Sequence, residues 1–126
     1  MAKQWDPAEA AQATRAIYRR VLEREPDDSG LIVHSSILNH GELSVREIVL
    51  AIGKSDEYRN RMVVPLTIRD AAKAMYRHFL AREAESETAV DGHAGVIAAA
   101  GFRAAVDGFL ESEEYRNRFG EDTVPA

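Results

Sequence analysis

The sequence contains no cysteine among its 126 residues. This absence excludes disulfide bonds, thiolate nucleophiles, and zinc or iron–sulfur sites built from cysteine. No apolar run approaches the roughly 18 residues that indicate a membrane-spanning helix. The first ten residues, MAKQWDPAEA, lack the apolar segment of a secretory signal. We therefore expect a cytoplasmic protein that does not insert into membranes.

An excess of positive charge is also absent, since 16 lysines and arginines stand against 21 aspartates and glutamates, for a formal charge of −5. Nucleic-acid-binding domains present a basic surface, so no nucleic-acid partner is expected. Lysine is scarce: Lys3, Lys54 and Lys73 are the only lysines, and the other positive residues are arginines. Arginine is favoured at protein interfaces, although a GC-rich genome would enrich arginine and alanine as well.

The composition is that of an ordinary soluble globular protein, with 45% apolar and 29% charged residues. A chain of this length has room for one domain with one core. We therefore predict a single domain over residues 1–126.

The sequence repeats itself. SDEYRNRM at Ser55–Met62 returns as SEEYRNRF at Ser112–Phe119, an offset of 57 residues, and AIYRRVLERE at Ala16 returns as AMYRHFLARE at Ala74, an offset of 58. The pattern predicts one unit of about 47 residues used twice, at about residues 16–62 and 74–119. Repeats of this period are typical of helical units that bury a shared core.

Capping residues divide each unit into helices. Four polar residues have the spacing of helix N-caps: Asp6, Ser44, Ser55 and Ser112. The first helix is expected to run to about Arg24, the second from Asp28 or Ser29 to Gly41, and the third to Gly53. The second unit is expected to begin at Thr67, and Gly120 to end its last helix. No strand pattern of useful length is found, so the predicted fold class is all-α: a compact domain of about eight short helices in two tandem related units.

Helical spacing also predicts the core. Its expected members are seven large residues that recur with the helical period: Tyr18, Leu22, Tyr58, Tyr76, Phe79, Phe109 and Tyr115. The segment from Val63 to Leu66, which includes Pro65, is expected to join the two units and is too short for a flexible linker.

Residue patterns for catalysis or metal binding are weak. The four histidines, His34, His40, His78 and His93, are not paired at the i, i+4 spacing of a helical metal site. A calcium-like loop around Gly30 has Ser36 where the bidentate glutamate belongs. The carboxylates are explained as helix caps, and no glycine-rich phosphate loop occurs. We expect no catalytic, cofactor-binding or metal-binding residues, and no enzyme.

The arginines are the candidate site. Six of them are candidates for protein binding: Arg19, Arg20, Arg59, Arg77, Arg116 and Arg118. One interpretation is a solvated face with local ion pairs to residues such as Glu57 and Glu114, each worth roughly 0.3–0.5 kcal/mol. The other is a docking surface of arginines with aromatic neighbours. The sequence leaves both open.

These motifs resemble a known family. YRRVLEREPDDSGL followed by LNHGELSVREIVLAIGKSDEYRNRM is similar to the first half of the phycobilisome linker domain. MYRHFLAREAES followed by GFRAAVDGFLESEEYRNRFGEDTVP is similar to its second half. The resemblance extends from about Ala13 to Pro125.

The resemblance implies an all-helical, non-enzymatic scaffold of the rod or core that organises phycobiliprotein assemblies through protein contacts. It also implies no covalently bound pigment, no cofactor, and a place at the cytoplasmic side of the thylakoid. Antenna linkers are typically basic, whereas this chain is acidic. An alternative is therefore a related helical adaptor or self-assembly module in a bacterium that lacks phycobilisomes. An enzyme or ligand-binding domain is a third hypothesis.

Overall fold

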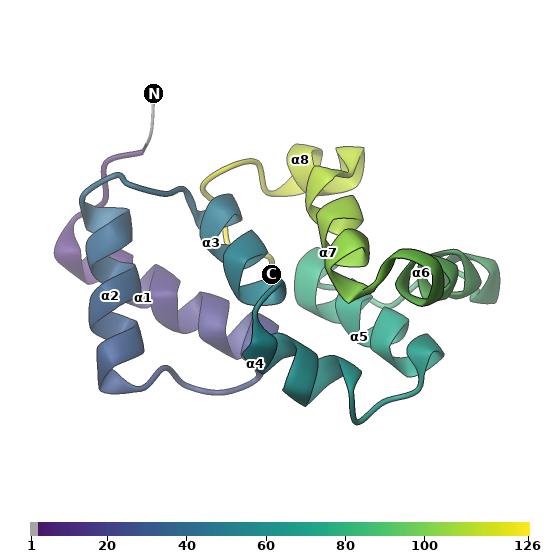
Figure 1. The fold of residues 1–126 in the computed structure, drawn as a ribbon. Coiled ribbons are helices and arrows are strands. Elements are labelled where there is room, and N and C mark those ends of the chain that lie inside the picture. Colours follow the sequence, from purple (N-terminus) through teal and green to yellow (C-terminus); the bar gives the residue numbers. More distant parts are fainter. Residues whose placement is uncertain (1–2) are drawn as a thin grey trace.

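A computed structural model describes residues 3–126 of the chain (Figure 1). The described residues form helices and connecting turns without a β-strand, which confirms the predicted all-α class. The chain order comprises eight α-helices and two π-helical turns: α1 (Pro7–Ile17), η1 (Tyr18–Leu22), α2 (Asp28–Asn39), α3 (Val45–Gly53), α4 (Asp56–Tyr58), η2 (Arg59–Val63), α5 (Ile68–Leu80), α6 (Glu87–Ala100), α7 (Phe102–Glu111) and α8 (Glu113–Arg118).

The predicted N-caps are confirmed. Asp6 and Ser44 each form a complete capping box, in which the side chain accepts from the third helical N–H and the glutamate at that position reaches back to the cap. The hydroxyls of Ser55 and Ser112 accept from the backbone N–H of Tyr58 and Tyr115, each at 3.1 Å. These local bonds satisfy N–H groups that have no partner within the helix.

The predicted ends of the first two helices are wrong by about two residues. The first helix stops at Leu22 because Glu23 adopts a left-handed conformation with φ 54°. The second stops at Asn39, and Gly41 then takes φ 69°, a value that glycine adopts without steric cost. The helix end therefore lies before the glycine that marks it in the sequence.

Two helices end in π-helical turns that the sequence pattern did not predict. Tyr18–Leu22 continues α1, and Arg59–Val63 continues α4 after a single α-helical turn. A π turn contains one extra residue per closed ring and still keeps the apolar side chains on roughly one side. Hydrophobic periodicity alone could not distinguish it from an α turn.

One core runs between the two halves of the chain. In Figure 1, α1 and α2 lie at one end of the molecule and α6 at the other, with α3, α5 and α7 between them. All seven residues predicted for the core are buried, which confirms that prediction. Gly53 allows α3 to approach α5 closely, since a β-carbon there would lie 2.8 Å from the ring of Phe79.

Helices α3 and α7 are joined by reciprocal contacts. Arg46, near the start of α3, donates from Nε to the carbonyl of Leu110 near the end of α7 at 3.0 Å. Arg103, near the start of α7, donates from Nε to the carbonyl of Lys54 at the end of α3 at 2.9 Å. Arg46 and Arg103 are 57 residues apart, the same offset that separates the two octapeptides. The two tandem related units themselves stay a prediction.

None of the helices formed by residues 3–126 combines the length and the apolar character that a membrane span requires.

Candidate protein-binding surface

Three of the four histidines pack against aromatic rings, and His40 is exposed. The His34 ring lies 2.9 Å from the hydroxyl of Tyr18, and His93 stacks on Phe109 with ring centroids 4.1 Å apart. Within residues 3–126, no group of three or more histidine, aspartate or glutamate side chains is arranged to hold a metal ion. The candidate site is therefore the surface arginines.

Arg20 links two elements that together carry three of the six candidate arginines. Arg19 and Arg20 lie on η1, and Arg77 lies in the last turn of α5. Arg20 donates from Nη1 to the carbonyl of Arg77 at 3.3 Å and from Nε to the carbonyl of Pro125 at 3.1 Å. Arg20 thereby fastens the segment around Pro125 to the boundary between η1 and α5.

A shallow hollow of about 410 Å³ opens beside these arginines. Its lining combines guanidinium groups with small apolar side chains: Ala16, Arg19, Arg20, Val124, Pro125 and Ala126. Arg19 is exposed and pairs through Nε with Glu25 at 2.6 Å, and Arg77 is exposed with its paired carboxylate, Glu83, 3.8 Å away. Much of the donor capacity of Arg19 and Arg77 faces solvent, so this surface can accept carboxylates from a partner.

The other three candidates are not joined to this group by any described contact. Arg118 donates to the carbonyl of Leu80 at 2.6 Å and pairs with Glu114 at 2.9 Å. Arg116 donates weakly to the carbonyl of Glu111 at 3.4 Å, and Arg59 donates to its neighbour Asn60 at 3.4 Å.

The repeated octapeptide has a structural use that the sequence did not reveal. In the first copy, Arg61 donates from Nη2 to the carbonyl of Leu22 at 3.1 Å. In the second copy, Arg118 makes the same kind of bond to Leu80. Both bonds satisfy carbonyls at the end of the first helix of a unit, where no helical donor is left. Arg118 is therefore partly committed to the fold.

A second pair of arginines, which was not among the candidates, forms matched forks. Arg24 binds both carboxylate oxygens of Glu57 at 2.7 and 2.8 Å, and Arg82 binds both oxygens of Glu114 at 2.8 and 2.7 Å. The Arg24 hydrogen bond lowers the pKa of Glu57, and the Arg82 hydrogen bond lowers the pKa of Glu114 to about 2. The repeated LERE and LARE motifs contained the signal for these pairs.

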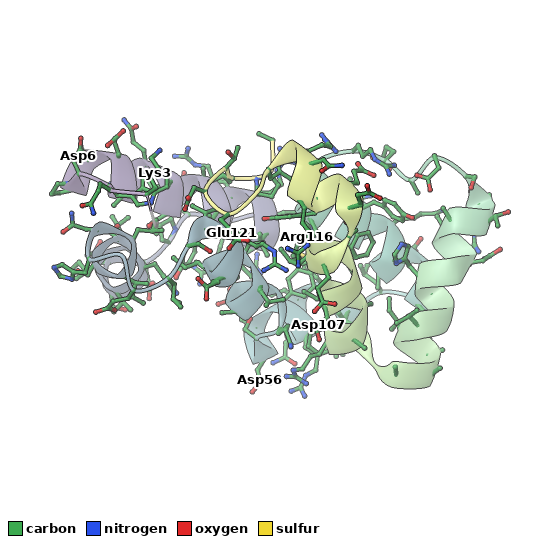
Figure 2. The ribbon with its side chains drawn as sticks, turned by 90° about the horizontal axis from the view of Figure 1, so that it is seen from above. Lys3, Asp6, Asp56, Asp107, Arg116 and Glu121 are labelled. Carbon is green, nitrogen blue, oxygen red and sulfur yellow. The ribbon has the colours of Figure 1, made fainter. Side chains whose placement is uncertain are left out.

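Charged side chains also line the junction of α3 and α4 with α7. Figure 2 shows Asp56 and Asp107 on this side of the molecule. Asp107 binds the ammonium group of Lys54 at 2.9 Å, and Asp56 binds Arg103 at 2.9 Å. These ion pairs connect the two halves of the chain and leave little unpaired charge at the junction.

A chain of polar side chains, buried at Tyr58 and His78 and exposed at Glu23, crosses the other junction between the halves. His78 on α5 places Nε2 2.7 Å from the carboxylate of Glu23 and Nδ1 2.8 Å from the hydroxyl of Tyr58. A carboxylate only accepts hydrogen bonds, so Nε2 carries the proton and Nδ1 accepts from Tyr58. Burial lowers the pKa of His78 and favours this neutral form of the imidazole.

The His78 ring makes stability depend on pH. Burial lowers its pKa, the Glu23 carboxylate offsets that shift in part, and Arg77 and Arg20 lower the pKa further. The folded protein therefore keeps His78 neutral at pH values where the same side chain in the unfolded protein, with a pKa of about 6.5, takes up a proton. Because the unfolded state then binds more protons, the free energy of unfolding is fully retained above about pH 6.5 and falls as the pH drops below it.

We expect His78→Gln to flatten this dependence. Urea unfolding between pH 7 and pH 5 should show a shallower fall in the free energy of unfolding for the variant than for the natural protein. His93 has a lowered pKa for the same reason, burial, and leaves part of the slope in place. His40→Gln, at an exposed position, is the control and should keep the full slope. Equal slopes in His78→Gln and the natural protein would contradict this account.

Comparisons with known proteins bear on what such a surface is for. The family model described as Phycobilisome Linker polypeptide matches residues 5–126. A phycoerythrin-associated 31.8 kDa rod linker polypeptide of the phycobilisome from Microchaete diplosiphon is 35% identical over 128 residues, covering 97% of this chain and 45% of that protein. A phycocyanin-associated 32.1 kDa rod linker polypeptide from Synechocystis sp. is 34% identical, covering 93% and 41%.

A protein that is not named as a linker contains a region similar to this chain. Phycobiliprotein ApcE from Nostoc sp. is 36% identical over 122 residues, which cover 94% of this chain and 11% of that protein. The chain thus spans less than half the length of each of these curated relatives.

Proposed function

Because the chain belongs to the phycobilisome linker polypeptide family, we propose that it is a scaffold that organises phycobiliprotein assemblies through protein–protein contacts. The observation that carries the proposal is the match of this family over residues 5–126. Two relatives are named for their association with phycoerythrin and phycocyanin, and we propose these pigment proteins as the class of partner. The proposal assigns the chain no catalytic step and no cofactor, and it places the protein at the cytoplasmic surface of the thylakoid.

We further propose that Arg19, Arg20 and Arg77 belong to the binding surface. Arg19 and Arg77 are exposed; Arg19 lines the hollow beside Pro125, and Arg77 adjoins it through its carbonyl, which accepts from Arg20. Guanidinium groups bind carboxylates with two parallel hydrogen bonds, and arginine is enriched at interface hot spots. An acidic chain can therefore still dock through a local basic surface onto a partner that presents carboxylates. Arg59, Arg116 and Arg118 are proposed as secondary contacts.

Neutralising this surface is expected to weaken binding. The double variant Arg19→Gln, Arg77→Gln should bind purified phycocyanin or phycoerythrin about tenfold more weakly at low salt, and the difference should shrink at 0.5 M salt because screening weakens exposed charge pairs. Titration of the fluorescently labelled chain with each pigment protein measures the affinity.

The matched control substitutes the positive residues that lie four positions before Arg19 and Arg77. Arg15→Gln, Lys73→Gln removes the same charge from the same two helices at positions outside the lining of the hollow. This control should bind within about threefold of the natural chain. Equal losses in the two double variants would show that net charge matters and that the hollow is not the contact. Binding of neither pigment protein by the natural chain would contradict the proposed function itself.

A further inference from the structure

An apolar patch lies on the turn between η2 and α5. Its members, which we call the join patch, are Val64, Leu66 and Ile68, whose exposed fractions are 68%, 39% and 44%. These are three of the six large hydrophobic residues that are exposed within the described chain, and they fall within five consecutive positions around Pro65. Clustered exposed apolar side chains on a soluble domain indicate a contact surface.

The turn that carries the join patch is held by hydrogen bonds. The N–H of Val64 donates to the carbonyl of Arg59 at 2.9 Å, and the N–H of Leu66 donates to the carbonyl of Val63 at 3.1 Å. Thr67 then caps α5 by accepting from the N–H of Asp70 at 3.1 Å. The apolar side chains are therefore presented on a fixed backbone, which lowers the entropy cost of docking.

The internal repeat provides a comparison for this turn. At the offset of 57 that relates the two octapeptides, Val64 and Pro65 correspond to Glu121 and Asp122. There the chain turns back onto the domain: Glu121 accepts from the hydroxyl of Ser44 at 3.0 Å. The exit from the second octapeptide is thus acidic and hydrogen-bonded to the start of α3, whereas the exit from the first is apolar and exposed. Forming such a unit does not require apolar residues at this position.

Charge beside the join patch indicates which partner it fits. Arg59, whose carbonyl holds Val64, is exposed, and its guanidinium lies 4.0 Å from the carboxylate of Asp56. Arg69 on the other side is neutralised by contacts with Glu87 and Asp91. Asp56 is already bound by Arg103 at 2.9 Å, so the less neutralised positive charge beside the patch is that of Arg59, on the η2 side. The complementary surface is an apolar pocket with a carboxylate on one rim.

We propose that the join patch docks into an apolar pocket with a carboxylate rim on a phycobiliprotein, with Arg59 facing the carboxylate. This inference rests on the proposed function and assigns it a second contact, separate from the hollow beside Pro125. The apolar side chains supply the buried centre of the contact, and Arg59 sets its orientation.

The test uses a charged substitution in the patch and a matched one elsewhere. Val64→Asp, Leu66→Asp is compared with Ile32→Asp, Val33→Asp, which introduces the same groups at exposed apolar positions of α2. Each chain is titrated against the pigment protein, phycocyanin or phycoerythrin, that binds the natural chain more tightly. The patch variant is expected to bind at least about 30-fold more weakly, as loss of a hot spot does. The control should remain within about threefold.

Sedimentation of each chain alone and thermal unfolding complete the test. Both double variants should unfold within a few degrees of the natural protein. If Val64→Asp, Leu66→Asp unfolds at a much lower temperature, Val64→Ser, Leu66→Ser replaces it. If the patch variant binds as tightly as the natural chain, the inference is wrong and the proposed function stands. If the natural chain forms a dimer that the patch variant loses while pigment-protein binding persists, a second copy covers the patch and the inference is overturned. If the natural chain binds neither pigment protein, both are overturned.

Discussion

Tyr58→Ala is expected to lower the free energy of unfolding by about 3–5 kcal/mol, the usual cost of removing a buried aromatic ring. Tyr58 has no exposed surface, and its ring contacts Phe79 and Phe102 with centroid distances of 5.5 and 6.4 Å. The substitution also leaves the buried Nδ1 of His78 without its donor. Urea unfolding followed by circular dichroism measures the change.

Tyr58→Phe separates the hydrogen bond from the ring. It keeps the packing and removes the hydroxyl that donates to His78, so the expected loss is about 1–3 kcal/mol, the cost of leaving a buried polar group unsatisfied. A loss below about 1 kcal/mol in Tyr58→Ala, where the ring itself is removed, would show that Tyr58 is not a core residue.

Tyr115→Ala is expected to destabilise the protein by a similar amount, about 3–5 kcal/mol. Tyr115 occupies the position of Tyr58 in the second octapeptide, is fully buried, and packs edge-on against Phe119 at 5.2 Å. Its hydroxyl differs from that of Tyr58 because it has no hydrogen-bond partner among the described residues.

The phenylalanine variants of the two tyrosines should therefore behave in opposite ways. Tyr115→Phe removes an unsatisfied buried hydroxyl, so the free energy of unfolding should stay the same or rise. Tyr58→Phe should lower it. A loss of more than about 1 kcal/mol in Tyr115→Phe would show that the Tyr115 hydroxyl is hydrogen-bonded in the folded protein.

The features that sequence predicted best are local. Asp6 and Ser44 predict helix starts because their side chains accept hydrogen bonds from N–H groups three residues away. The whole capping-box pattern therefore lies within four positions of the sequence. The core residues follow from helical spacing. The π-helical turns were missed because they change the hydrogen-bond ring and leave the apolar pattern nearly intact.

The candidate surface could be predicted only in part. Sequence identified the arginines, but it could not show that Arg20 reaches Arg77 and Pro125, since these contacts span 57 and 105 residues. It also could not separate Arg118, which bonds a helix-end carbonyl, from Arg19, which is exposed. Sequence predicts only a short connection at the join patch, because the exposure of Val64 and Leu66 depends on which elements pack against them.

The duplicated positions hold arginines of both kinds, those that bond within the fold and those that stay exposed. Arg61 and Arg118 occupy equivalent positions of the two octapeptides, and each donates to a carbonyl at the end of a preceding helix. Arg19 and Arg77 also repeat, at an offset of 58, yet they stay exposed. Repetition in the sequence thus marks structural and surface residues alike, and only the contacts in three dimensions tell them apart.

We propose that this chain joins phycobiliprotein assemblies. Sedimentation of the purified chain through a gradient with phycocyanin, and separately with phycoerythrin, tests it most directly. The account predicts that the colourless chain moves with one of the pigment proteins at a fixed ratio and increases the size of its assemblies. A chain that remains at the top of both gradients, with the pigment proteins sedimenting as they do alone, would contradict the claim.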